Sequence, residues 1–258
     1  MSNTLTHLSL FSGIGGLDLA AEWAGFQTIG QCEFADYPTA VLARHWPSVP
    51  RWRDIHTLTK ESFYERTHCS SPTIISGGFP CQPFSVAGKQ RGKADDRYLW
   101  PEMLRVIDEL HPNWVIGENV SGLIRIALDD ILDSLEEIGY SARAYCFTAQ
   151  ELGALFKGER IAIVASPNDR CAALRWDEQL QTDGRSPRRG NHLRGRTTEF
   201  NPRKWWSLES RPYGVVDGVS NRVDRLKCLG NAVVPWQFYP LFASIAELET
   251  LSERTDTQ

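Results

Sequence analysis

The sequence predicts an α/β protein with a mostly parallel, doubly wound sheet of the Rossmann type. Two observations support this fold class: strand-like and helix-like runs alternate through the first two thirds of the chain, and the strand-like runs end in glycines or acids. In such sheets, ligands bind beyond the carboxyl ends of the strands. With 258 residues, the chain can form one large domain or one domain with a small appendage.

The first unit has the pattern of strand, glycine turn and helix. Residues 5–11 are strand-like, residues 12–16 form the turn Ser-Gly-Ile-Gly-Gly, and Leu17 to Trp23 follow with helical spacing. This order opens nucleotide-binding α/β units. The dinucleotide fingerprint has a third glycine where this chain has Asp18, and a carboxylate at a helix start disfavours a bound pyrophosphate. S-adenosylmethionine, an adenosine cofactor without phosphates, therefore fits the turn better.

The next two units end in acids suited to an adenosine. The strand-like run 27–32 ends at Glu33, whose carboxylate can accept hydrogen bonds from both ribose hydroxyls. In the third unit, Asp54 can bind an adenine amino group while Ile55 covers the ring. We therefore expect Glu33, Asp54 and Ile55 at the cofactor.

Later runs complete the predicted sheet. Residues 73–76 and 114–120 are strand-like, and residues 140–148 and 160–165 read as a closing pair of strands. A helix ending at Gly139 is predicted before that pair. Its apolar side chains recur at helical spacing and are expected in the core: Ile124, Leu128, Ile131, Leu132, Leu135 and Ile138.

Cys81 stands between two prolines directly after the predicted strand 73–76. Proline restricts the backbone and lacks an amide donor, which favours a stiff loop at the carboxyl end of the strand. A thiol in that place is a candidate nucleophile. The alternative is a buried structural cysteine, which is common in intracellular chains.

Composition narrows the class of protein. Hydrophobic residues make up 41% and charged residues 23%, as in globular proteins. No apolar run approaches the roughly 20 residues of a membrane span, and the N-terminus lacks a basic signal-peptide start, so we expect a cytoplasmic protein. The six cysteines form neither a Cys-x-x-Cys pair nor a ligand cluster, so we expect no metal site and no disulfide framework.

Positive charge is concentrated in one segment of an otherwise acidic chain. The net charge is −4, yet residues 185–204 carry seven basic residues against one acid, Glu199. Trp205 and Trp206 follow directly, and basic residues next to aromatic ones suit a surface that meets phosphates and bases. The alternative is a solvated loop.

Six blocks of the sequence resemble, in order, those of the DNA cytosine-5 methyltransferases. They are Phe11 to Gly16, Glu33, Asp54-Ile55, Gly78 to Gln82, Glu118 to Val120 and Gly230 to Pro235. The resemblance spans almost the whole chain. It implies a catalytic domain over residues 1–166, a short, irregular target-recognition region over 167–212, a returning segment over 213–250 and a disordered tail over 251–258.

The resemblance also implies a mechanism. The Cys81 thiolate would attack carbon 6 of a cytosine flipped out of double-stranded DNA, which makes carbon 5 nucleophilic. Glu118 would hold or protonate ring nitrogen 3. Arg160 would contact the base oxygen and orient the glutamate.

Binding residues follow from the same blocks and from the basic segments. Those expected at S-adenosylmethionine are Phe11, Ser12, Gly13, Ile14, Gly15, Gly16, Glu33, Phe34, Asp54, Ile55, Pro80, Leu99, Asn231, Ala232 and Val233. Those expected at DNA are Gln82, Ser85, Lys89, Arg91, Arg97, Arg188, Arg189, Arg194 and Arg196. Four of them, Ser85, Lys89, Arg91 and Arg97, belong to a loop expected to form a lid over the flipped base. The family also suggests a cognate restriction endonuclease as a partner, and we expect a monomer.

Two departures from the family keep alternatives open. The family has Pro-Gln-x-Arg-x-Arg where this chain has Phe156 and Gly158 before Arg160, so a weakly active or inactive DNA-binding relative is one alternative. The tripeptide at Cys146 is similar to one in the transfer-RNA branch, so an RNA methyltransferase is another, although the tripeptide precedes the Arg160 block. A thiol hydrolase is disfavoured because no histidine is an evident partner for Cys81.

Overall fold

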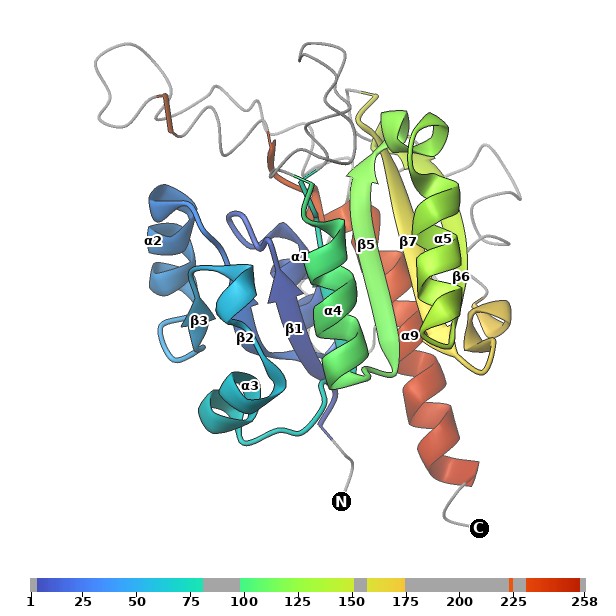
Figure 1. Ribbon diagram of the computed structural model, residues 1–258, viewed down its shortest axis with the longest axis horizontal. Helices are drawn as coiled ribbons and strands as arrows, with labels where there is room; N and C mark the ends of the chain where they lie inside the picture. Colours follow the sequence, from blue (N-terminus) through green and yellow to red (C-terminus); the bar gives the residue numbers. More distant parts are fainter. Residues whose placement is uncertain (1–3, 81–97, 151–156, 175–222, 225–230, 256–258) are drawn as a thin grey trace, which may run out of the picture.

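The computed structural model describes residues 4–80, 98–150, 157–174, 223–224 and 231–255. In this part of the chain, seven strands form one sheet in the order β3-β2-β1-β4-β5-β7-β6. The strands from β3 to β5 run parallel, whereas β7 is antiparallel to both of its neighbours, β5 and β6. The mostly parallel, doubly wound fold class is therefore confirmed (Figure 1).

The elements follow the predicted runs closely. The strands are β1 (Thr6–Leu10), β2 (Gln27–Cys32), β3 (Arg51–Trp52), β4 (Ile74–Gly77), β5 (Trp114–Val120), β6 (Tyr140–Thr148) and β7 (Glu159–Pro167). The α-helices are α1 (Gly16–Trp23), α2 (Asp36–His45), α3 (Lys60–Thr67), α4 (Trp100–Leu110), α5 (Leu128–Glu137) and α9 (Pro235–Thr255). Short 3-10 helices occur at η1 (Ile55–Thr57), η4 (Ser121–Arg125) and η6 (Arg170–Ala173).

Helices cover both faces of the sheet. Helices α3, α4 and α5 pack on one face, and α1 and α9 pack on the other, as Figure 1 shows. Helix α4 illustrates why: Trp100, Met103, Val106 and Ile107 recur at helical spacing and are buried. Because both faces are covered, β5 is buried on both sides from Trp114 to Gly117.

One predicted core residue is exposed. Ile124 lies in η4 and is 42% exposed, because the run predicted as one helix is divided into η4 and α5. The other five apolar positions pack against the core, Ile131 and Leu135 with no exposed surface.

Two observations concern the predicted boundaries. Beyond β7, Cys171 and Leu174 are buried in the same core cluster as residues of α9. Helix α9 continues to Thr255, past the predicted start of the tail at residue 251. Its far end is anchored because Glu249 accepts hydrogen bonds from Trp114 Nε1 and Asn113 Nδ2, both at 2.9 Å. The predicted recognition region lies outside the described residues from residue 175 to residue 212.

None of the described helices combines the length and the hydropathy of a membrane span.

A buried carboxylate ties the first helix to the sheet. Asp18, in the first turn of α1, has no exposed surface and accepts hydrogen bonds from Ser9 Oγ and Gln31 Nε2, both at 2.8 Å. Burial raises the pKa of Asp18 to about 6, although both hydrogen bonds act to lower it. The folded protein therefore holds this proton more tightly than the unfolded chain, and stability falls as the pH rises from about 4 to about 6.

We therefore expect Asp18→Asn to stabilise the protein at pH 8 by about 1 to 3 kcal/mol, because the amide keeps the shape without the buried charge. Urea unfolding at pH 5 and pH 8 measures this. The gain should shrink at pH 5, where wild-type Asp18 is largely protonated. Asp36→Asn, at an exposed acid on α2, is the control and should change little. A loss of stability in Asp18→Asn at pH 8 would show that the two hydrogen bonds outweigh the burial of charge.

Candidate active site

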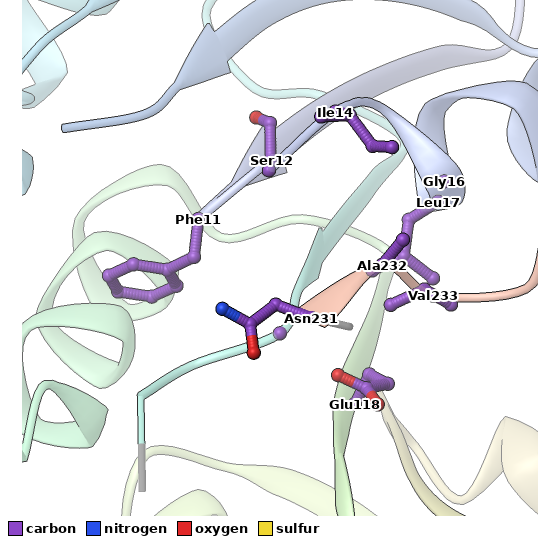
Figure 2. Close-up of a pocket in the computed structure, with 11 residues that line it drawn as sticks. Phe11, Ser12, Ile14, Gly16, Leu17, Glu118, Asn231, Ala232 and Val233 are labelled. Carbon is purple, nitrogen blue, oxygen red and sulfur yellow. The ribbon is translucent and has the colours of Figure 1, made fainter. Parts of the chain in front are cut away.

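A pocket lies at the carboxyl edge of the parallel strands. It is formed by the turn between β1 and α1, by Gly78 after β4, by Glu118 on β5 and by the segment that leads into α9. Its lining residues are Phe11, Ser12, Gly13, Ile14, Gly16, Leu17, Gly78, Glu118, Asn231, Ala232 and Val233. Figure 2 shows the side chains of Phe11, Asn231 and Glu118, which line the pocket from three separate segments.

The pocket brings together most of the residues that the sequence places at the cofactor. Eight of the fifteen line it, and Glu118 joins them; the eight are Phe11, Ser12, Gly13, Ile14, Gly16, Asn231, Ala232 and Val233. Leu17 and Gly78 were not predicted as site residues. Both adjoin predicted blocks, Leu17 after the glycine turn and Gly78 at the start of the Cys81 block, which is the signal that could have identified them.

The other predicted cofactor residues do not line this pocket. Ile55 is 4% exposed and belongs to the core, which leaves little of its side chain to cover an adenine ring. Asp54 caps η1 and accepts hydrogen bonds from the amide and from Nδ1 of His56. Leu99 packs against the core, whereas Phe34 is 78% exposed. Gly15 and Pro80 likewise lie outside the lining.

Glu33 holds the glycine turn from the end of β2. Its carboxylate accepts a hydrogen bond from the amide of Gly13 and another from the amide of Ala35, both at 2.8 Å. The Gly13 amide is therefore already hydrogen-bonded to the Glu33 carboxylate and is not free to bind a phosphate. The sequence predicts Asp18 as the carboxylate that disfavours a pyrophosphate at this turn. That prediction is wrong, because Asp18 is buried beneath the turn and Glu33 supplies the negative charge instead.

Glu118 and Arg160 form an ion pair across two strands. In the antiparallel register of β5 and β7, Glu118 lies opposite Ala162, so Arg160 is its diagonal neighbour on the same face. Arg160 Nε lies 3.0 Å from Glu118 Oε1, and only 12% of the Glu118 side chain is exposed. Burial raises the pKa of Glu118 to about 7, while the positive charge of Arg160 and its hydrogen bond oppose that rise. Both protonation states of Glu118 are thus accessible near neutral pH.

The loop after β4 is fitted closely to Glu118. A Cβ atom at Gly78 would lie 2.8 Å from Glu118 Oε2, so a larger residue there would displace the carboxylate from its present position. Asn119, the next residue on β5, donates from Nδ2 to the carbonyl of Phe79 at 3.0 Å. These contacts hold the segment that enters Cys81 beside Glu118. Cys81 itself lies outside the described residues, as do all the DNA-contacting residues predicted above.

The departure from the family pattern at Gly158 coincides with a left-handed backbone conformation. Gly158 has φ of +46°, a left-handed conformation that an arginine would adopt only with strain. Phe156, the other departure, lies outside the described residues.

Three of the four described cysteines are poor candidates for a nucleophile. Burial raises the pKa of Cys32 to about 12, and it also raises the pKa of Cys146 and Cys171. The tripeptide that begins at Cys146 lies inside β6, as expected from its position before the Arg160 block. Within the described ranges, no group of three side chains could hold a metal ion.

Comparison with known proteins assigns the family. The family model of C-5 cytosine-specific DNA methylases matches residues 5–194. The chain belongs to this family. Its match therefore extends from β1 through the Glu118–Arg160 pair to the first half of the basic segment.

Two bacterial relatives illustrate the extent of the similarity. The chain is 34% identical to Type II methyltransferase M.NgoFVII of Neisseria gonorrhoeae, over 63% of this chain and 44% of that protein. It is 35% identical to Type II methyltransferase M.AplI of Arthrospira platensis, over 64% of this chain and 46% of that protein. The chain thus spans less than half the length of either relative.

Solved structures share the fold. A prophage-encoded protein of E. coli is 25% identical and superposes with a TM-score of 0.55, over 64% of this chain and 47% of that one. The Dnmt2 methyltransferase of S. pombe is 21% identical, with a TM-score of 0.53 over 64% of this chain and 51% of the other. The second likeness concerns the fold alone.

Proposed function

We propose that this protein transfers a methyl group from S-adenosylmethionine to carbon 5 of a cytosine flipped out of double-stranded DNA. The observation that supports this best is the partly buried pair of Glu118, which lines the pocket, and Arg160, in a chain of the cytosine-5 methylase family. A carboxyl group with a pKa near 7 can donate a proton to ring nitrogen 3 at neutral pH.

The pocket suits S-adenosylmethionine better than a phosphate-bearing nucleotide. The Glu33 carboxylate already occupies the Gly13 amide, and its negative charge favours a cationic cofactor over an anionic one. Phe11 and Val233 offer apolar surface, and Glu33 retains lone pairs for ribose hydroxyls. The cofactor, when bound, supplies an electrophilic methyl group.

The protein's own residues do the remaining work in this proposal. Cys81 forms a bond to carbon 6, and the ring electrons shift toward carbon 5 while Glu118 protonates nitrogen 3. Arg160 keeps the Glu118 carboxyl in place. After methylation, a base removes the proton at carbon 5 and the sulfur–carbon bond breaks, which frees Cys81. The base is not identified by the sequence or by the described residues.

DNA is the substrate we propose, with contacts from residues 82–97 and 185–204. Both segments lie outside the described residues, so their role rests on their charge and on the family. Relatives named Type II methyltransferases support a restriction-modification setting and a cognate endonuclease. The RNA alternative is weaker because the tripeptide at Cys146 is part of β6 and lies outside the pocket lining.

A methyl-transfer assay tests the proposal directly. The full chain is incubated with S-adenosylmethionine carrying a labelled methyl group and with duplex DNA, single-stranded DNA or transfer RNA. We expect label in duplex DNA, and bisulfite sequencing should locate it at cytosines within one short sequence. Label in transfer RNA alone would establish the RNA alternative, and no transfer to any of the three would support an inactive relative.

Glu33→Ala tests the cofactor site. We expect S-adenosylmethionine binding to weaken by about 1 to 3 kcal/mol, or roughly 5- to 150-fold in Kd, because ribose hydrogen bonds and the support of the Gly13 amide are both lost. Titration calorimetry measures the change. Asp36→Ala, which removes a neighbouring exposed acid, should leave the Kd unchanged. An unaltered affinity in Glu33→Ala would place the ribose elsewhere.

A further inference from the structure

The turn that leads into β7 is held from the far end of the sequence. The carbonyl of Gly158 accepts two hydrogen bonds, from the amide of Ala149 at 3.2 Å and from Nε2 of Gln237 at 2.7 Å. Gly158 and Gln237 are 79 residues apart. Arg160 follows Gly158 by two positions, so this contact lies at the base of the strand that carries the arginine.

Gln237 lies in the first turn of α9. It is 3% exposed, and its backbone amide is bonded to the carbonyl of Val234 at 2.9 Å. The preceding residues, Asn231 to Val233, line the pocket. Val233 contacts Gly16 closely, because a Cβ atom on Gly16 would lie 2.4 Å from the carbonyl oxygen of Val233. The start of α9 therefore touches both the glycine turn and the β6–β7 hairpin.

A second contact joins the same two elements. Phe238, next to Gln237, packs edge-on against Phe147 with ring centroids 5.3 Å apart. Phe147 lies directly opposite Arg160 in the β6–β7 register. Phe238 supplies apolar packing, which can slide, whereas the Gln237 amide supplies a directional bond that can fix the hairpin in one position.

We propose that Gln237 is a positioning residue, which holds the β6–β7 hairpin so that Arg160 keeps its contact with Glu118. The proposal rests on the function proposed above for these two residues. In the family pattern an arginine stands where this chain has Gly158. Here the left-handed glycine turns its carbonyl to Gln237, and the amide of Gln237 fixes the turn.

The pKa of Glu118 reports the position of the Arg160 guanidinium, because the positive charge lowers that pKa. Within the described ranges, Arg160 is the charged side chain that acts on the pKa of Glu118. Lys157 and Glu159, which also lie at this end of the hairpin, pair with each other at 3.7 Å. A displaced guanidinium would stabilise the Glu118 carboxylate less. The carboxyl would then hold its proton to a higher pH.

The experiment replaces Gln237 by methionine, which keeps the length and loses the amide. The titration of Glu118 is followed in the full chain, without DNA or cofactor, by infrared difference spectra against Glu118→Gln. We expect the titration midpoint to rise by about half to one pH unit. If the chain methylates DNA, kcat should fall about tenfold while KM for S-adenosylmethionine changes less than about twofold. An unchanged midpoint in a folded Gln237→Met protein would overturn the proposal.

Two further variants serve as a control and as a substitute in this test. Glu249→Gln loosens the opposite end of α9, where Glu249 pairs with Arg170, and should lower thermal stability without moving the midpoint. An equal shift in that variant would mean that any loosening of α9 acts on Glu118, which also overturns the proposal. Should Gln237→Met not fold, Gln237→Asn places a shorter amide at the site and should give the same shift. Because the titration needs no catalysis, its outcome is independent of the methyl-transfer assay.

Discussion

Cys81→Ser is expected to abolish methyl transfer while S-adenosylmethionine binding stays within about twofold of wild type. A serine hydroxyl ionises far less readily than a thiol, so it cannot add to carbon 6 of the cytosine at a useful rate. The substitution changes one atom, and Cys81 does not belong to the residues assigned to the cofactor. Residual methylation above a few percent of the wild-type rate would refute the covalent mechanism.

A matched control exists on β6. Cys146→Ser removes a thiol whose pKa is raised by partial desolvation and by the charge of Glu159, and it should retain full activity. Covalent trapping provides a second measurement. Duplex DNA with 5-fluorocytosine cannot lose a proton from carbon 5, so wild type and Cys146→Ser should remain bound through denaturing electrophoresis, whereas Cys81→Ser should not. Loss of trapping in Cys146→Ser, with trapping kept in Cys81→Ser, would assign the nucleophile to Cys146 instead.

The sequence predicted the parts of the fold that are set by local pattern. The bounds of β2, β5 and β6 agree with the predicted runs. Glu118 and Arg160 were both assigned to the site from separate blocks. Their pairing depends on the β5–β7 register, which the sequence pattern alone does not specify.

The errors and omissions concern side-chain directions and contacts between distant segments. Asp18 looked like a residue of the cofactor turn, but its partners Ser9 and Gln31 draw it beneath the sheet edge. Phe11 follows β1 with φ of +51°, a conformation that no propensity predicts for a bulky residue. The bond between Gln237 and Gly158 joins residues with no pattern in common. Tertiary packing decides each of these, and local sequence carries no signal for it.

The pKa of Glu118 depends on its contact with Arg160, and it determines the expected pH dependence of methyl transfer. The Arg160 guanidinium lowers the pKa of Glu118, and burial raises that pKa more, to about 7. The active form needs Glu118 protonated and the thiol of Cys81 ionised, and these two demands oppose one another as the pH changes. We therefore expect a bell-shaped dependence of kcat/KM on pH, with the falling limb near pH 7 assigned to Glu118 in the free enzyme.

Glu118→Gln is expected to lower kcat/KM by about 10²- to 10³-fold and to remove the falling limb. The amide can hold ring nitrogen 3 but cannot protonate it, so the remaining activity should rise with pH as the thiol ionises and then stay level. Initial rates of methyl transfer between pH 5.5 and 9 measure both effects. Glu159→Gln, at an exposed acid on the same hairpin, should keep the wild-type profile. A falling limb that persists in Glu118→Gln would assign it to another group, and Glu118 would then act only by holding the base.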